Sequence, residues 1–229
     1  MFKKINLSFE IKSMGATFYF SFLGFITIAY TLYNFTDDQL EFTLFSLLEF
    51  VVSPLACWWT IFLFYDYFEG NAEELIFSYP LTIYQHGLFR LIVFGVLYLI
   101  PFGICLLIIS YLHKYPFLNM VIQYFSISIF LISLGFFLTV LLRSVITSLI
   151  LIIVYVTIEF LTQGEIYIYH AMLFNKESIP LENILTKSIL NTILAILLFF
   201  ISHKFFRYGG LNFKLKIMKF VNKKTSPNR

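Results

Sequence analysis

The chain has 229 residues, of which 59% are hydrophobic, 21% are aromatic and only 13% are charged, and its mean hydropathy is +0.84. Soluble domains carry about a quarter charged residues, so this composition excludes an ordinary soluble protein and predicts an all-α polytopic membrane protein. The net charge of +3 gives no reason to expect nucleic acid as a partner.

Residues 1–14 precede the first long apolar run. They include Lys3, Lys4 and Lys12, with apolar residues between them. This mixture is typical of a segment that lies on the inner face of a membrane. We expect it to be partly helical, although the alternation from Ile5 to Ile11 also fits a strand.

Six apolar runs follow, each close to the ~20 residues that cross a hydrocarbon core. An acidic loop over Asn34–Phe42 separates the first two, and the longest polar stretch, Gln163–Lys187, separates the last two. The predicted transmembrane helices are Gly15–Tyr33, Thr43–Tyr65, Leu88–Leu112, Phe117–Leu142, Val145–Thr162 and Ser188–His203.

The basic residues predict the orientation of the chain. If both termini share one side, all of the 16 Lys and Arg residues except Lys114, Lys176 and Lys187 fall on that side. Because cytoplasmic loops are enriched in Lys and Arg, we expect the N-terminus and the C-terminus to be cytoplasmic. The polar stretch between spans two and three, Asp66–Pro80, then faces the cytoplasm as well.

That polar stretch has the pattern of a short helix. Asn71 is a good N-cap, Glu74 stands at the capping-box position, and Pro80 ends the helix. One apolar face results, formed by Ala72, Leu75, Ile76 and Tyr79. Two helical turns are not stable alone in water, so this face lies either on the membrane interface or bundle, or on a second protein.

No motif predicts a catalytic, cofactor or metal site. The chain contains no G-x-x-x-x-G-K-[ST], H-E-x-x-H or G-x-S-x-G pattern, and its four histidines are scattered. The remaining candidates are two acidic residues inside predicted spans, Glu49 and Glu159, because intramembrane charges are costly. Either they reach the outer interface or hydrogen-bond within the bundle, or they line a substrate pathway that opens outward.

The tail, Lys204–Arg229, combines basic residues with Phe, Leu and Ile. On the inner face this composition favours anchoring to anionic lipid, with contact to a partner protein as the alternative.

The segment from Glu69 to Thr82 is similar to a short motif of one transporter family. Its Glu-Gly-Asn, Glu-Leu and Ser-Tyr-Pro steps resemble the glutamate-glycine-threonine, glutamate-leucine and serine-x-proline pattern of ABC transporter permease subunits of the type-2 exporter class. Asn71 stands where threonine is usual, and Tyr79 stands where leucine or a smaller residue is common. With the topology, the resemblance covers almost the whole chain.

The resemblance implies one transmembrane domain over residues 1–229. It divides into an interfacial segment (1–14), a six-span bundle (15–203) and a cytoplasmic tail (204–229), with a cytoplasmic coupling helix between spans two and three. Short re-entrant outer helices are implied between spans five and six, within Gln163–Lys187. The coupling-helix residues implied to contact a partner are Glu69, Ala72, Glu73, Glu74, Leu75, Ile76 and Tyr79.

The implied partners are an ABC ATP-binding subunit and a second permease chain, identical or not, within membrane lipid. ATP and Mg would bind to the ATP-binding subunit, so this chain carries no cofactor and is not an enzyme on its own. An apolar wall favours an apolar or amphipathic substrate, such as a peptide, a lipid-like molecule or a drug. The composition hints at a bacterial cytoplasmic membrane. The alternatives are a non-transporting protein that confers immunity by binding a toxin or peptide, and an integral membrane enzyme.

Overall fold

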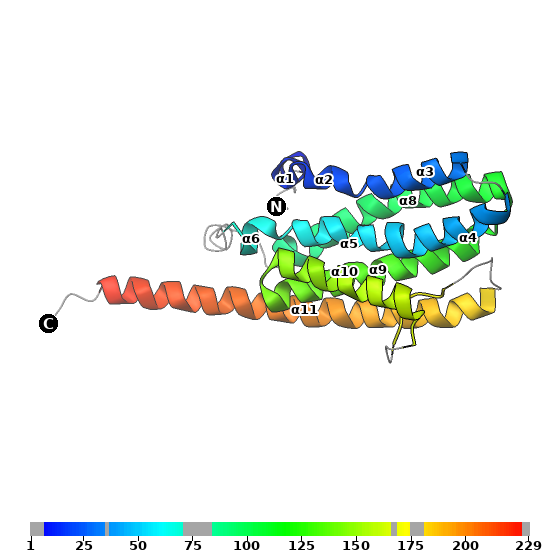
Figure 1. Cartoon of the computed structure of the whole chain (residues 1–229). Coiled ribbons are helices and arrows are strands. Elements are labelled where there is room, and N and C mark those ends of the chain that lie inside the picture. The colour runs from blue at the N-terminus through cyan, green and yellow to red at the C-terminus, as the bar shows by residue number, and fades with distance from the viewer. Residues whose placement is uncertain (1–6, 35–36, 71–83, 166–168, 175–180, 226–229) are drawn as a thin grey trace.

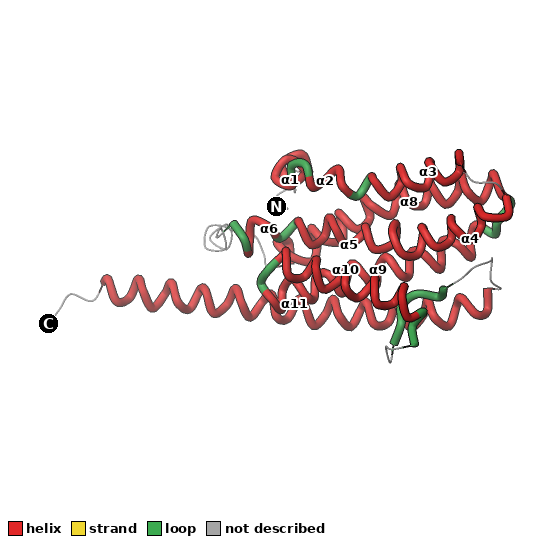
Figure 2. The backbone as a smooth tube through the Cα atoms, in the orientation of Figure 1, coloured by secondary structure: helices red, strands yellow, loops and turns green. Residues whose placement is uncertain are grey.

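A computed structural model describes residues 7–34, 37–70, 84–165, 169–174 and 181–225 of the chain. Within these ranges every regular element is a helix, and Figures 1 and 2 show that most helices run along one common direction. Five helices are long and apolar enough to cross a membrane, and a bent pair at the N-terminus makes a sixth if it is counted as one span. The prediction of an all-α multi-pass membrane protein is therefore confirmed.

The three middle spans have the predicted bounds to within two residues. They are α8 (Arg90–His113), α9 (Phe117–Leu142) and α10 (Val145–Thr162). Both breaks between them begin with a left-handed residue, Lys114 after α8 and Arg143 after α9. Ser144 then caps α10 by accepting a hydrogen bond from the backbone N–H of Thr147 at 3.3 Å.

The N-terminal segment turns sharply before the bundle. Helix α1 (Leu7–Met14) makes an angle of 87° with the stretch Thr17–Asn34. Gly15, with φ of 56°, adopts the left-handed conformation that this corner needs. The expected helix in residues 1–14 is confirmed for Leu7–Met14. The predicted first span is broken into α2 (Thr17–Phe20) and α3 (Leu23–Asn34).

Two tryptophans hold the broken span against α5 (Ser53–Phe62). The indole Nε1 of Trp58 donates to the carbonyl of Thr17 at 3.0 Å, and that of Trp59 donates to the carbonyl of Phe18 at 2.7 Å. The Phe18 and Trp59 rings also stack, with 4.6 Å between their centroids. Aromatic contacts of this kind fix α2 in place where the chain changes direction.

Span two begins earlier than predicted and contains a π-helical turn. Helix α4 (Asp37–Leu47) starts inside the predicted acidic loop. The turn η1 (Leu48–Val52) follows it, and the span continues into α5. Pro54 has no backbone N–H to donate, and just before it Ser53 donates both its backbone N–H and its hydroxyl to the carbonyl of Leu48.

After α5 comes α6 (Tyr65–Phe68), and η2 (Gln85–Phe89) leads into α8. The last helix, α11 (Leu181–Thr225), is much longer than the predicted span Ser188–His203 and continues through the predicted tail. In Figure 1 its C-terminal part extends beyond the other helices, at the end of the bundle where α1 lies. The span assigned to it is Ile184–Phe206.

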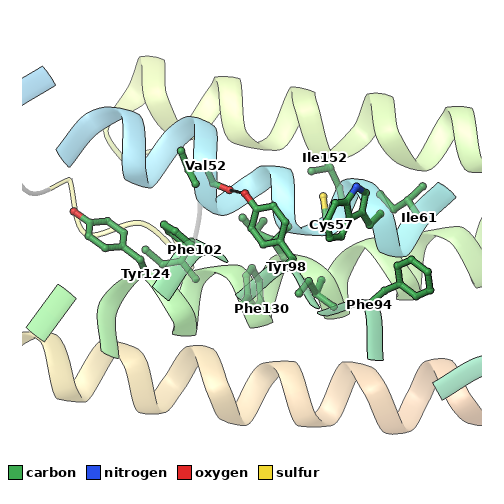
Figure 3. Close-up of a cluster of buried hydrophobic side chains, with 14 of the residues drawn as sticks. Val52, Cys57, Ile61, Phe94, Tyr98, Phe102, Tyr124, Phe130 and Ile152 are labelled. Carbon is green, nitrogen blue, oxygen red and sulfur yellow. Dashed lines mark hydrogen bonds between the residues drawn. The ribbon is translucent and has the colours of Figure 1, made fainter. Parts of the chain in front are cut away.

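Helix α9 is the centre of the bundle. Within its most apolar window 61% of the residues are buried, against 22% for α10 and for the spanning part of α11. Figure 3 shows the aromatic core that packs on it, with Phe94, Tyr98 and Phe102 reaching from α8. The hydroxyl of Tyr98 donates to the carbonyl of Val52 at 2.7 Å, in the π-helical turn of span two.

Candidate functional site

Two buried carboxylates from different spans contact one irregular segment of the chain. Glu49 comes from η1 and is 1% exposed, whereas Glu159 comes from α10 and is fully buried. Both side chains contact the same non-helical segment, Tyr169–Phe174, which we call the strap.

Glu159 binds the first half of the strap. One carboxylate oxygen, Oε1, accepts the backbone N–H of Ala171 at 2.9 Å, and Oε2 accepts that of Met172 at 3.4 Å. The hydroxyl of Tyr155, one turn earlier on α10, donates to Oε1 as well. Ala171 and Met172 are fully buried, so their amides depend on acceptors inside the protein, and that of Ala171 also donates to the Tyr155 hydroxyl at 3.3 Å.

Glu49 binds the second half of the strap. Its Oε1 accepts the backbone N–H of Leu173 and, at 3.2 Å, that of Phe174. Four consecutive backbone amides are therefore satisfied by two carboxylates from different spans. Irregular backbone is tolerated at membrane depth only where its polar groups find such partners inside the protein.

A third helix, α11, completes the cluster. Asn191 donates from Nδ2 to the carbonyl of Ala171 at 3.1 Å and accepts the hydroxyl of Tyr169. The ammonium of Lys187 lies 4.9 Å from the centroid of the Tyr169 ring, close enough for a cation–π contact. Burial raises the pKa of Tyr169 to about 12, and the negative charge of Glu159 acts in the same direction. This hydroxyl therefore remains a donor at neutral pH.

The strap is also shaped by its own backbone. Gln163 and Gly164 end α10 with φ of 48° and 82°, and Phe174 has φ of 56°. A Cβ atom on Gly164 would lie 2.9 Å from the ring of Phe174, so only glycine fits this turn. Burial lowers the pKa of His170, which packs beside the Phe174 ring, and the nearby Lys187 charge lowers it further.

The strap corrects one detail of the sequence prediction. Re-entrant helices were expected in Gln163–Lys187, but the strap residues Tyr169–Phe174 are not helical, although they fold against the bundle. For Glu49 and Glu159 the structure has the hydrogen bonds within the bundle that were one of the two alternatives. Their role in a substrate pathway stays a prediction.

A second polar cluster lies at the opposite end, where α1 meets α8. The guanidinium of Arg90 forms a salt bridge with Glu10 and donates to the hydroxyl of Tyr67 at 2.7 Å. Burial raises the pKa of Tyr67 to about 12, although the positive charge of Arg90 opposes this shift. Arg90 thus joins α1, α6 and α8, whereas the sequence only placed it among the basic residues of the predicted cytoplasmic side.

Glu69 also has an internal role at this end. Its Oε1 accepts the hydroxyl of Ser144 at 2.8 Å and the backbone N–H of Val145 at 3.1 Å. A carboxylate at this position satisfies the first turn of α10 and interacts favourably with its dipole. The other predicted coupling-helix residues lie outside the described residues, namely Ala72, Glu73, Glu74, Leu75, Ile76 and Tyr79.

Neither cluster has the composition of a metal centre. In the described part of the chain no three His, Cys, Asp or Glu side chains are grouped so that they hold a metal ion. The carboxylates instead act as acceptors for hydrogen-bond donors of the protein, which fixes the backbone rather than supplying a nucleophile.

The chain was compared with family models, with curated proteins and with solved structures. No match was found.

Replacing Glu69 with glutamine is expected to loosen the start of α10. Glutamine keeps an acceptor oxygen but loses the charge, so we expect a loss of about 1 kcal/mol in the free energy of unfolding. Denaturant unfolding in detergent, followed by tryptophan fluorescence, measures this loss. The neighbouring exposed residue Asp66 offers a control, and an Asp66→Asn variant that loses as much would contradict the capping role.

Proposed function

We propose that this chain is the permease subunit of an ATP-driven ABC exporter. It would move an apolar or amphipathic substrate, such as a peptide, a lipid-like molecule or a drug, across the membrane. Energy would come from a separate ATP-binding subunit, and a second permease chain would complete the pathway. The chain itself would hydrolyse nothing.

The observation that best supports this proposal is that the residues on both sides of 71–83 are attached to other helices of the bundle. On the N-terminal side, Glu69 is tied to the start of α10, and on the C-terminal side, Arg90 is tied to α1. Tyr67 and Arg90 join the two sides to each other at 2.7 Å. A force applied to residues 71–83 would therefore reach α1, α8 and α10 together, which a coupling element between an ATPase and a bundle requires.

Helix α1 adds support. It lies at 87° to the following stretch, the orientation of an amphipathic helix in the membrane plane beside a span. Glu10 and Met14 are its buried residues, whereas Phe9 is 66% exposed. An exposed aromatic residue together with the exposed Lys12, one turn later, suits the headgroup region of a bilayer.

The interior supports an apolar or amphipathic substrate. Its largest fully buried side chains are apolar or aromatic, among them Trp59, Phe64, Phe102 and Phe136. The carboxylates of Glu49 and Glu159 accept backbone amides of the strap. A small ion would need oriented polar groups along its path, and this apolar interior does not favour one.

We expect Leu75→Asp and Ile76→Asp to abolish transport-coupled ATP hydrolysis. A charge on the predicted apolar face cannot be buried in a groove of the ATP-binding subunit without a large desolvation cost. Leu75→Met, which keeps volume and polarity, is the matched control and should retain coupling.

The test begins with purification of the chain from its native membrane in mild detergent with lipid. A stoichiometric partner with a Walker A motif and ATP hydrolysis that needs both chains would support the proposal. If the chain elutes alone but still protects cells from a toxin, the result would favour the alternative function, that of a non-transporting protein that confers immunity. Normal coupling in well-folded Leu75→Asp would contradict the docking assignment.

A further inference from the structure

A buried hydroxyl group on α9 lies outside the hydrogen bonds that hold the strap. On α9, the hydroxyl of Tyr124 is buried and has no hydrogen-bond partner within the described residues, although the residue is only 1% exposed. Figure 3 shows that this hydroxyl points away from Phe102 and Phe130, out of the aromatic core. A buried hydroxyl without a partner is costly, and a second state in which it is paired would remove this cost.

Glu49 is the charged residue of the element that packs beside this hydroxyl. The turn η1, which carries Glu49, packs directly against α9, which carries Tyr124. In the described state, Oε1 of Glu49 accepts the amides of Leu173 and Phe174. The strap and Tyr124 are therefore alternative donors for one carboxylate.

The elements around Glu49 suit a change between two arrangements. Glu49 stands in a π-helical turn, a feature that is frequent at functional sites because its hydrogen-bond register shifts readily. Phe174 is held with φ of 56°, a conformation that is unfavourable for a bulky residue and persists only while its surroundings impose it. Release of the strap from Glu49 would relieve this strain.

Glu159 holds the first half of the strap in both arrangements. It holds Ala171 and Met172 from α10, whereas Glu49 holds Leu173 and Phe174 from span two. Any movement of α10 away from span two pulls the strap in two directions. Since Asn191 and Glu159 bind the Tyr169–Met172 half together, the Glu49 contact is the one that is replaced more easily.

We propose that Glu49 is a two-state latch. It holds the strap over the end of the bundle when the strap is closed, and it accepts the hydroxyl of Tyr124 when the strap opens. The latch needs no ATP-binding subunit, so it is independent of the permease proposal. If the permease proposal also holds, the strap is the gate at the outer end of the pathway.

Cysteine labelling measures strap opening directly. In a chain with Cys57 and Cys105 replaced by alanine, Met172→Cys places a buried thiol on the strap itself, and a membrane-impermeant maleimide reports its exposure. The chain is reconstituted alone in lipid vesicles, without ATP. Glu165→Cys, at an exposed position near the end of α10, controls for orientation and reagent access.

Two variants move the latch in opposite directions. Glu49→Met removes the acceptor, and we expect labelling of the thiol introduced by Met172→Cys to become faster by about tenfold or more, as for the loss of charge-assisted hydrogen bonds. Tyr124→Phe removes a hydroxyl that is unpaired in the closed state and bound to Glu49 in the open state, and we expect labelling to become slower by roughly three- to tenfold. Glu165→Gln, which alters an exposed carboxylate, should leave the rate unchanged.

The double variant Glu49→Met/Tyr124→Phe distinguishes a hydrogen bond between the two residues from independent effects of each substitution. If the Tyr124 hydroxyl acts through Glu49, Tyr124→Phe has no further effect in the Glu49→Met background. If the hydroxyl is merely an unfavourable buried group of the closed state, the two effects multiply, and the proposal is overturned. An unchanged rate in either single variant also overturns it. Should Glu49→Met not fold, Glu49→Gln replaces it, with a smaller effect of the same sign.

An ATP-dependent increase in labelling, seen only with the ATP-binding subunit present, would connect the latch to transport. Its absence, with the variant effects intact, would contradict the permease proposal and leave the latch standing.

Discussion

Replacing Glu159 with leucine is expected to destabilise the protein by about 3 kcal/mol or more. The change leaves the amide of Met172 and the hydroxyl of Tyr155 without their acceptor, each at a cost of about 1–3 kcal/mol, and it leaves the amide of Ala171 with only its longer contact to the Tyr155 hydroxyl at 3.3 Å. The loss should appear in the free energy of unfolding in detergent, followed by the fluorescence of the two tryptophans.

Two further variants show what Glu159 contributes. Glu159→Gln keeps one acceptor oxygen and should lose about half as much, because charged acceptors are roughly twice as strong as neutral ones. Glu182→Leu changes an exposed carboxylate at the start of α11 and should stay within about 0.5 kcal/mol of the parent. If Glu159→Leu loses no more than Glu182→Leu, the strap is not held by this carboxylate.

The sequence identifies Glu49 and Glu159 as unusual but does not reveal their partners. A charged residue in an apolar run is conspicuous, since it must be paired or reach water. The partners are backbone amides, 124 and 125 positions later for Glu49 and 12 and 13 positions later for Glu159. Every residue except proline carries such an amide, so no side-chain pattern marks these residues as the strap.

Helix bounds follow from the sequence where the signals are local. Hydropathy and the break at Arg143-Ser144 are enough to predict α9 and α10 correctly. The interrupted first span depends instead on Trp58 and Trp59, which bind its backbone from span two, about 40 positions away. The extension of α11 through the basic tail was not predicted. Hydropathy falls where the charged residues begin, but a helix can continue through charged residues.

The Glu10–Arg90 pair was not predicted for a similar reason. The two residues are 80 positions apart, and each on its own is typical of a membrane-interface residue. Their side chains are only 11% and 13% exposed, so they form a buried ion pair and not a surface one. Mutation of either residue therefore tests whether α1 is attached to the bundle through this pair.

Arg90→Met is expected to release α1. The change leaves the carboxylate of Glu10 buried without its counter-charge, which costs about 3 kcal/mol or more. That loss corresponds to roughly a hundredfold in the docking equilibrium of α1. Met14→Cys, in the background without Cys57 and Cys105, reports docking, since Met14 is 7% exposed and becomes accessible to a thiol reagent when α1 leaves.

Glu10→Leu and Arg90→Met should raise the rate of thiol labelling by different amounts, and the double variant should label more slowly than Arg90→Met. Glu10→Leu leaves Arg90 with the Tyr67 hydroxyl as an acceptor, so labelling should rise less than in Arg90→Met. In Glu10→Leu/Arg90→Met neither charge is left unpaired, and replacing a buried ion pair by apolar residues is often nearly neutral. We expect its labelling rate to return to within about tenfold of the parent. Multiplicative effects would instead mean that the two residues stabilise α1 independently, and that movement of η2 and α8 is not passed to α1 through this pair.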